Sequence, residues 1–408
     1  MAGGLRRNRD FLRLWLGQSV SHAGSAVSAV GIQFAAIVSF HATPSEMGLL
    51  SAAGGIGMLI FGLFAGAWAD RFRRRPLMIG ADLGRAAVLA TIPWAAMRGH
   101  LSMVWLYTAA AAAGALTVLF DAAYRAHLPQ LVSEDQLLEA NAKLALSQSV
   151  AEVGGPGAAG LLIRLLGAPR AILADSLSFL WSAGCLLMIQ KPESRPSPDS
   201  AKEDVRAEIT EGLRTAWQHP ALRAIALRNG TGAFFLGAVG GLYFVFGVRE
   251  LGLDSAWIGG IISFGGAFSV LGSAAAERLA GRVGLGRAMI AGAVATGVGS
   301  LIPGLAHGPK LLCAAFLCAS QLFDLGWPVY GIGEATLIQS VTPNHLTGRV
   351  SASMQLLFRG VVPLGALAAG VLAERLGLRA AMLTGGIGYL LSAGWLAGCR
   401  ELRNWRPV

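Results

Sequence analysis

The chain has 408 residues, of which 54% are apolar and only 14% are charged, and its mean hydropathy is +0.56. This composition excludes an ordinary soluble domain and indicates an integral membrane protein. The formal net charge of +10 therefore concerns membrane orientation more than nucleic acid, and we expect no nucleic-acid partner.

Twelve apolar stretches are long enough to cross a lipid bilayer. Seven contain no charged side chain, at 14–39, 47–69, 100–120, 229–248, 255–276, 288–306 and 380–399. Five more include ionisable residues, at 77–97, 143–166, 168–190, 311–333 and 350–373. The sequence thus predicts an all-α integral membrane fold with twelve transmembrane helices in two six-helix bundles.

The distribution of basic residues predicts the orientation of these spans. With a cytoplasmic N-terminus, 24 of the 33 Lys and Arg residues fall in cytoplasmic segments and seven fall outside, as the positive-inside rule requires. We expect a multi-pass protein of the cell (inner) membrane with both termini in the cytoplasm. A charged, proline-bearing linker at 191–223, with an amphipathic helix over Val205–Trp217, separates bundles at 1–190 and 224–408.

The second half repeats the first at an offset near 210 residues. The segment 159–167 reads Ala-Gly-Leu-Leu followed by Leu-Gly, and 369–377 reads Ala-Gly-Val-Leu followed by Leu-Gly. The loop segments 129–133 and 338–342 are also similar. Duplicated bundles joined by a linker favour a transporter, because a site between the halves opens to one side when the halves rock.

The loop between the second and third spans carries a dense charge pattern. It contains Gly66, Asp70, Arg71, Arg74 and Arg75. This pattern resembles the motif between the second and third helices of major facilitator superfamily transporters. The resemblance covers nearly the whole chain, and it implies a secondary transporter with a small-molecule substrate.

Further segments resemble the drug:proton antiporter branch that contains macrolide and siderophore exporters. They are 128–132, Ala140-Asn141 and a helix-five motif with Gly155, Pro156 and Gly160. The glycine ladder that usually precedes that motif is reduced here to Gly154 and Gly155.

The resemblance implies a gate at the loop motif. Asp70 would cap the next helix, and Arg74 would pair with Asp121 at the cytoplasmic side of the fourth helix. A carboxylate at a helix N-terminus is also favourable on physical grounds. The alternative is that these charges only mark topology, and we favour that alternative for Arg73 and Arg75.

Ionisable side chains at bilayer depth are costly and need a partner, water or a function. Glu152, near the middle of helix five, is the first candidate for proton coupling, although it could instead be a silent hydrogen-bonded group. Asp82 and Arg85 are spaced i, i+3 and favour a local pair. Asp82 and Asp324 are further coupling candidates.

The remaining charges and polar residues are candidates for substrate contact. Arg359 lies at a depth comparable to Asp324, so these two could form a salt bridge or bind an anionic group. Asp175 lies near the outer end of its span and could reach interfacial water. Helix one is unusually polar and lines the central cavity in the resembled superfamily, which adds the candidates Gln18, Ser25 and Gln33.

The function favoured by these patterns is proton-coupled efflux of a lipophilic small molecule by alternating access. The substrate could be a drug, a siderophore or a secondary metabolite, and uptake of a small metabolite is the alternative. A membrane enzyme is disfavoured because the sequence has no converging catalytic motif, and a sensor is disfavoured because no soluble segment exceeds about 33 residues. We expect no cofactor, no metal and a functional monomer.

Overall fold

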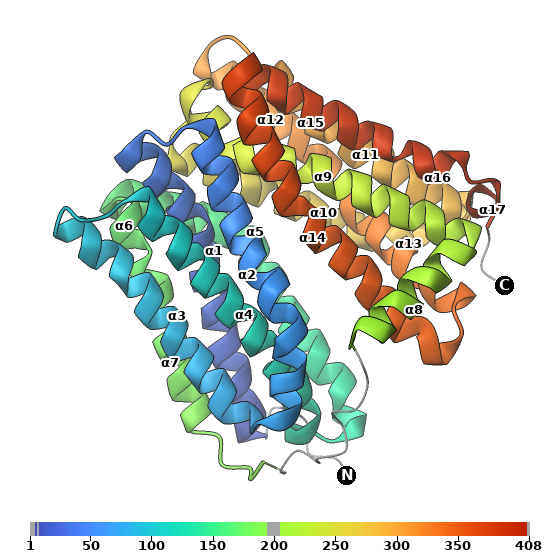
Figure 1. Cartoon of the computed structure of the whole chain (residues 1–408), viewed down its shortest axis with the longest axis horizontal. Helices are drawn as coiled ribbons and strands as arrows, with labels where there is room; N and C mark the ends of the chain where they lie inside the picture. Colours follow the sequence, from blue (N-terminus) through green and yellow to red (C-terminus); the bar gives the residue numbers. More distant parts are fainter. Residues whose placement is uncertain (1–4, 6–7, 194–204, 406–408) are drawn as a thin grey trace. The chain divides into compact units, whose positions relative to one another are not determined.

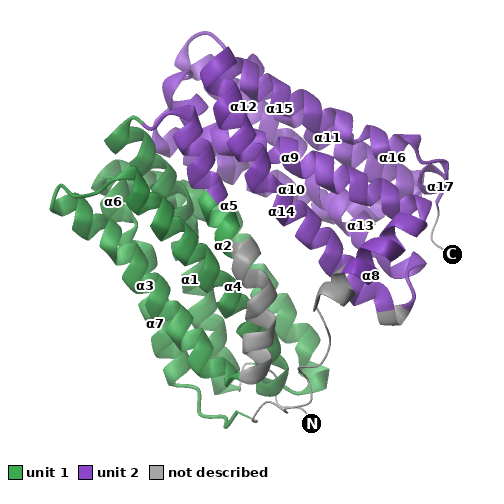
Figure 2. Cartoon of the chain, in the orientation of Figure 1, with its two compact units in different colours: residues 1–41, 53–202 green, residues 42–52, 203–408 purple. Residues whose placement is uncertain are grey.

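The computed structural model describes residues 5, 8–193 and 205–405, with the side chains at 58–71, 205–209 and 344–345 outside the described set. Within these residues every regular element is a helix (Figure 1). The chain divides into two compact units (Figure 2). Unit 1 comprises 1–41 and 53–202, and unit 2 comprises 42–52 and 203–408.

The helices follow in chain order. Those up to the linker are α1 (Arg9–Phe40), α2 (Pro44–Arg71), α3 (Arg74–Met97), α4 (Met103–Leu131), the 3₁₀ turn η2 (Glu134–Gln136), α5 (Leu137–Leu166), α6 (Ala168–Ala171) and α7 (Leu173–Leu187). Those after it are α8 (Val205–Gln218), α9 (Pro220–Arg249), α10 (Ser255–Val283), α11 (Leu285–Leu305), α12 (Lys310–Gln321), the 3₁₀ turn η4 (Leu322–Leu325), α13 (Gly326–Val341), α14 (Asn344–Leu376), α15 (Leu378–Ser392), α16 (Gly394–Gly398) and α17 (Arg400–Arg403).

Each expected span is mostly helical. Ten helices of the described part are long and apolar enough to cross a membrane. The expected spans at 47–69 and 143–166, in α2 and α5, are not among these ten, so the count of twelve stays a prediction. The predicted linker helix is present as α8, which packs against α9 and α14.

The helix packing repeats from one unit to the other. In unit 1, α1 packs against α5 and α7, and α3 packs against α4 and α7. In unit 2, α9 packs against α14 and α15, and α11 packs against α13 and α15. The same helix pairs, taken in chain order, therefore form both cores, which supports duplication as the origin of the fold.

Two glycines turn the chain at equivalent corners. Gly167, after α5, has φ +79°, and Gly377, after α14, has φ +89°. Such backbone angles strain residues that carry a Cβ atom. Each glycine lets the next helix begin at the following residue, and the 210-residue offset of the sequence repeat thus reappears in backbone geometry.

The tenth expected span is interrupted. Between α12 and α13, the 3₁₀ turn η4 includes Asp324. A 3₁₀ stretch within a long helix often marks a hinge or strain. The apolar window at 311–333 gave no sign of this break.

Candidate functional site

Unit 1 contains a buried ion pair in the middle of α3. Asp82 is fully buried and Arg85 is only 4% exposed, and an Arg85 guanidinium nitrogen contacts Asp82 Oδ1. The predicted local pair is therefore confirmed. The guanidinium carbon also lies 4.6 Å from the Phe120 ring centre and 4.0 Å from that of Phe179, so two aromatic faces enclose the cation.

Unit 2 contains a second enclosed guanidinium. Arg228 on α9 is 1% exposed, and its guanidinium carbon lies 3.9 Å from the Tyr330 ring centre and 5.3 Å from that of Tyr389. Arg228 Nη2 also donates to the Tyr389 hydroxyl at 3.0 Å. Here the rings supply both a π face and hydrogen-bonding oxygen.

The two ring pairs occupy equivalent positions in the repeat. Phe120 and Tyr330 are 210 residues apart in the sequence, and so are Phe179 and Tyr389. The cation, in contrast, comes from α3 in unit 1 and from α9 in unit 2. We call each ring pair an aromatic frame. The frame occurs in both halves of the chain, but the arginine that it encloses lies on a different helix in each half.

The unit 2 frame extends to a carboxylate through an amide. Asn229 Oδ1 accepts from the Tyr330 hydroxyl at 2.8 Å and from Arg228 Nη1 at 3.4 Å. Asn229 Nδ2 donates to Glu334 Oε1 at 2.6 Å. Glu334, on α13, is half-buried, so one amide links a buried cation to a carboxylate that is less enclosed.

Sequence reasoning missed both Arg228 and Glu334. The apolar windows at 229–248 and 311–333 each stop one residue short of them, because a window scan ends at a charge. In the structure, α9 begins at Pro220 and α13 continues to Val341. Both charges therefore lie inside helices. The equivalent aromatic positions in the repeat were a signal that could have found this site.

Asp175 corrects an expectation. It is 1% exposed, so it does not reach interfacial water within the bundle. Its Oδ1 accepts from Ser178 Oγ at 3.0 Å and from Ser25 Oγ of α1 at 3.5 Å. A Cβ atom at Gly24 would lie 2.7 Å from that oxygen, so the glycine admits the carboxylate to the α1–α7 interface.

Asp324 does not form the suggested salt bridge. A Cβ atom at Gly265 of α10 would lie 2.5 Å from Asp324 Oδ2, which places this carboxylate beside α10. The ion pairs that join described residues do not include Asp324 with Arg359. Arg359 is exposed on α14 and makes other contacts.

Glu152 lies on an open face of unit 1. It is exposed on α5 and accepts from Gln148 Nε2 at 2.8 Å. Glu152 and Asp121 of α4 are both near enough to His22 of α1 to interact with it electrostatically. Three helices thus place two carboxylates within electrostatic range of one imidazole. The sequence analysis singled out Glu152 and Asp121 but did not predict that both lie near His22.

The loop motif is only partly visible. Gly66, Asp70 and Arg71 lie in the last turns of α2, and their side chains are outside the described residues. The ion pairs among described residues do not include Arg74 with Asp121, and Arg74 Nε is buried without a hydrogen-bond partner. The expected Arg74–Asp121 latch is therefore not formed in this structure.

Glu193 caps α3. The Glu193 carboxylate accepts from the backbone N–H groups of Arg74 and Arg75, the latter at 3.2 Å. Arg75 in turn donates from Nε to the Leu186 carbonyl at 2.8 Å and from Nη2 to the Leu187 carbonyl. Arg75 thus caps the C-terminal end of α7, a structural role beyond marking topology.

We predict that Glu193→Ala lowers the stability of unit 1 by about 1 kcal/mol, because two N–H groups at a positive helix end lose their charged acceptor. The melting temperature in detergent should fall by roughly 3 °C. Glu250→Ala, at an exposed site after α9, is the matched control. An equal fall in both variants would contradict the capping role.

Polar residues of α1 hold unit 1 together more than expected. Gln18 is buried, and its Nε2 donates to Ser182 Oγ of α7 at 3.3 Å. Trp15 Nε1 donates to Ser147 Oγ of α5 at 2.8 Å. Polar bonds of this kind join helices where water is absent. Gln18 therefore bonds to α7 and is not free to contact a substrate. Gln33, in contrast, has a buried Oε1 without a hydrogen-bond partner.

The helix-five motif lies where α5 crosses α1 at close range. Gly155 is buried, and a Cβ atom there would lie 2.4 Å from Ala26 Cβ of α1. Pro156 lies inside α5 without ending it, and Gly160 is buried on the same helix. Small residues let α5 and α1 approach closely, which is a packing reason for this pattern.

Together, these observations define a class of protein. Two units with repeated helix packing, ten membrane-length apolar helices and ionisable groups held inside each bundle are the construction of a secondary transporter. Among the described residues no group of three or more His, Cys, Asp or Glu side chains could hold a metal ion. The sequence model of the Major Facilitator Superfamily matches residues 14–366, and the chain belongs to this superfamily.

Curated relatives match almost the full length. The multidrug efflux pump Tap of Mycolicibacterium fortuitum is 29% identical over 93% of this chain and 94% of its own. The macrolide efflux protein A of Streptococcus pyogenes is 24% identical over 90% of each chain. These relatives agree with the branch that the sequence resembled.

Solved structures confirm the fold. A crystal structure of the nucleoside transporter NupG covers 97% of this chain and all of its own, with a TM-score of 0.77 and 10% identity. A bacterial homologue of the iron transporter ferroportin covers 99% of this chain and all of its own, with a TM-score of 0.76 and 18% identity. At such identities the likeness concerns architecture alone.

Proposed function

We propose that this chain exports a lipophilic small molecule across the cell membrane by alternating access, using the proton gradient. The observation that carries the proposal is the match to an efflux pump at 29% identity over 93% of the chain. The family membership points to a transporter and not to an enzyme. In the proposed topology the chain acts as a monomer with both termini in the cytoplasm.

The proton-binding group of unit 1 in this proposal is Glu152. Its open position on α5, near Asp121 and His22, gives a carboxylate access to protons without the fixed guanidinium that holds Asp82. Asp70 and Arg74 keep their proposed role as a gate. Support for that role comes from the family pattern and not from a contact seen in this structure.

Cells that express the chain should accumulate several-fold less of an exported macrolide or cationic dye, and an uncoupler should remove the difference. We predict that Glu152→Gln abolishes the uncoupler-sensitive efflux, because a glutamine side chain carries no proton, while the protein still folds into the membrane. The measurement is accumulation with and without uncoupler, with membrane abundance determined in parallel.

The matched control is Glu139→Gln on the same helix, where the carboxylate pairs with Lys143 at 2.8 Å. This variant should keep full efflux. Unchanged gradient-driven efflux by the Glu152 variant would remove that residue from the mechanism. If efflux by the unaltered chain is the same with and without the uncoupler, transport is not coupled to protons.

A further inference from the structure

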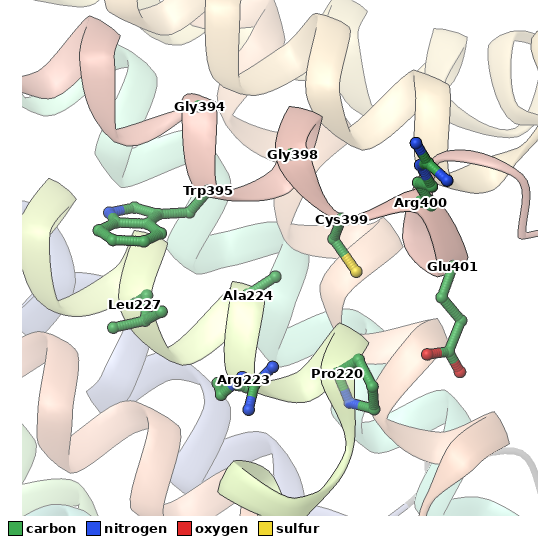
Figure 3. Close-up of a pocket in the computed structure, with 10 residues that line it drawn as sticks. All are labelled: Pro220, Arg223, Ala224, Leu227, Gly394, Trp395, Gly398, Cys399, Arg400 and Glu401. Atoms are coloured by element: carbon green, nitrogen blue, oxygen red, sulfur yellow. The ribbon is translucent and has the colours of Figure 1, made fainter.

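Unit 2 has a pocket of about 620 Å³ between the start of α9 and the end of the chain's last helices. Its lining residues are Pro220, Arg223, Ala224, Leu227, Gly394, Trp395, Gly398, Cys399, Arg400 and Glu401 (Figure 3). The proposed efflux mechanism uses none of these residues.

The lining of the pocket includes two arginines, Arg223 on α9 and Arg400 on α17 (Figure 3). Arg223 and Arg400 are both exposed, and neither guanidinium has a hydrogen-bond or ion-pair partner among the described residues. The Glu401 carboxylate, on the side of Arg400 (Figure 3), lies 3.4 Å from His219 Nε2. Two guanidinium groups and one carboxylate give the lining a net charge of +1. A monoanion would neutralise this charge.

The side of the pocket away from Arg400 is an apolar slot. Trp395 and Leu227 lie together on the side away from Arg400 and Glu401 (Figure 3). Gly394 and Gly398 are four residues apart, hence on one face of the helix, and a Cβ atom at either would meet nothing within 4 Å. The missing side chains leave room along α16 for a hydrocarbon chain.

The placement of these groups matches a membrane interface. Arg223 lies in the first turn of α9, and Arg400 begins α17 directly after the last apolar segment. The Trp395 side chain is 47% exposed, and tryptophan is typical of the level of lipid headgroups. In the predicted topology this end faces the cytoplasm, where basic pockets between helices bind anionic lipid headgroups.

We propose that this pocket binds an anionic phospholipid, with phosphatidylglycerol as the matching lipid. The positive charge of Arg223 and Arg400 attracts its anionic headgroup to the pocket, and one acyl chain lies along Gly394 and Gly398 beside Trp395. A free phosphate would interact only with the arginines, so the apolar slot favours a lipid. The site is independent of the transported molecule.

The test measures lipid binding to the purified full-length chain. Dioleoyl phosphatidylglycerol or dioleoyl phosphatidylcholine is added in detergent, and bound lipid is counted by native mass spectrometry while the melting temperature is recorded. The expected result is preferential retention of phosphatidylglycerol, with a higher melting temperature than with phosphatidylcholine. Two basic groups at an anionic headgroup favour binding by roughly 30-fold, so Arg223→Gln/Arg400→Gln should lose most of this preference.

Two further variants separate charge, shape and folding. Arg164→Gln/Arg170→Gln removes the same charge from exposed sites in unit 1 and should keep the preference. Gly394→Leu fills the slot while leaving both arginines, and it should lose the retained lipid. An equal response to both lipids, an undiminished preference in the Arg223/Arg400 variant, or the same stabilisation by glycerol 3-phosphate alone would overturn the proposal.

Discussion

Arg85→Leu is expected to destabilise unit 1 by about 3–5 kcal/mol, because it leaves a buried carboxylate without its cation. Asp82 has no exposed surface, and the groups around the lost guanidinium are the rings of Phe120 and Phe179. Neither ring can supply positive charge. The melting temperature in detergent, measured by size-exclusion chromatography after heating, should fall on the order of 10 °C.

A double variant distinguishes loss of the pair from loss of packing. Asp82→Leu/Arg85→Leu removes both charges, and an apolar replacement of a buried pair is often close to neutral, so much of the lost stability should return. Arg98→Leu is the control on a surface cation, which stacks on Trp94 at 5.4 Å and should change little. Equal losses at Arg85 and Arg98 would contradict a structural role for the buried pair.

Glu334→Gln is expected to reduce pH-gradient-driven transport at least tenfold while substrate counterflow continues. The glutamine oxygen can still accept from Asn229 Nδ2, so the hydrogen-bonded connection to Arg228 is preserved. What disappears is a carboxylate that can change charge next to a fixed guanidinium. The groups facing Glu334 are Arg228 of α9 and Tyr330 of its own helix, with Tyr389 of α15 bonded to the guanidinium.

Proteoliposomes allow the two activities to be measured on one preparation, first with an imposed pH gradient and then with substrate on both sides. Glu277→Gln, an exposed acid of unit 2, should keep both activities. Gradient-driven transport that survives Glu334→Gln would show that Glu334 does not couple transport to the pH gradient. Loss of counterflow together with loss of monodisperse protein would show a purely structural network. Absence of gradient-driven transport in the unaltered chain would instead refute the proposed function.

Hydropathy and loop chemistry were sufficient to predict the bundle architecture, because a bilayer restricts spanning segments to long apolar helices. The Asp82–Arg85 pair was also predictable, since two residues three apart on one helix need no tertiary information. Contacts between distant helices were different. Nothing local indicated that Glu193 would cap α3 or that Asp175 would be enclosed by hydroxyl groups.

Charged residues at the edges of apolar windows were the site residues that the sequence analysis most often missed. Arg228 and Glu334 are compatible with a buried position only because rings and an amide from other segments reach them. A scan of single windows cannot register that compensation. Comparing the two halves position by position would have helped, because the aromatic frame recurs at the repeat offset even though the arginine does not.

The recurrence of the frames suggests how the halves diverged. At the repeat offset, Arg228 corresponds to Gln18, and Arg85 corresponds to Ala295. The ring pair thus recurs in both halves, whereas the positive charge comes from α3 in one half and from α9 in the other. A guanidinium placed against the same rings can therefore come from different helices, provided that polar partners such as Asp82 or Asn229 accompany it. Two halves with the same aromatic core can therefore carry their buried charges at different positions.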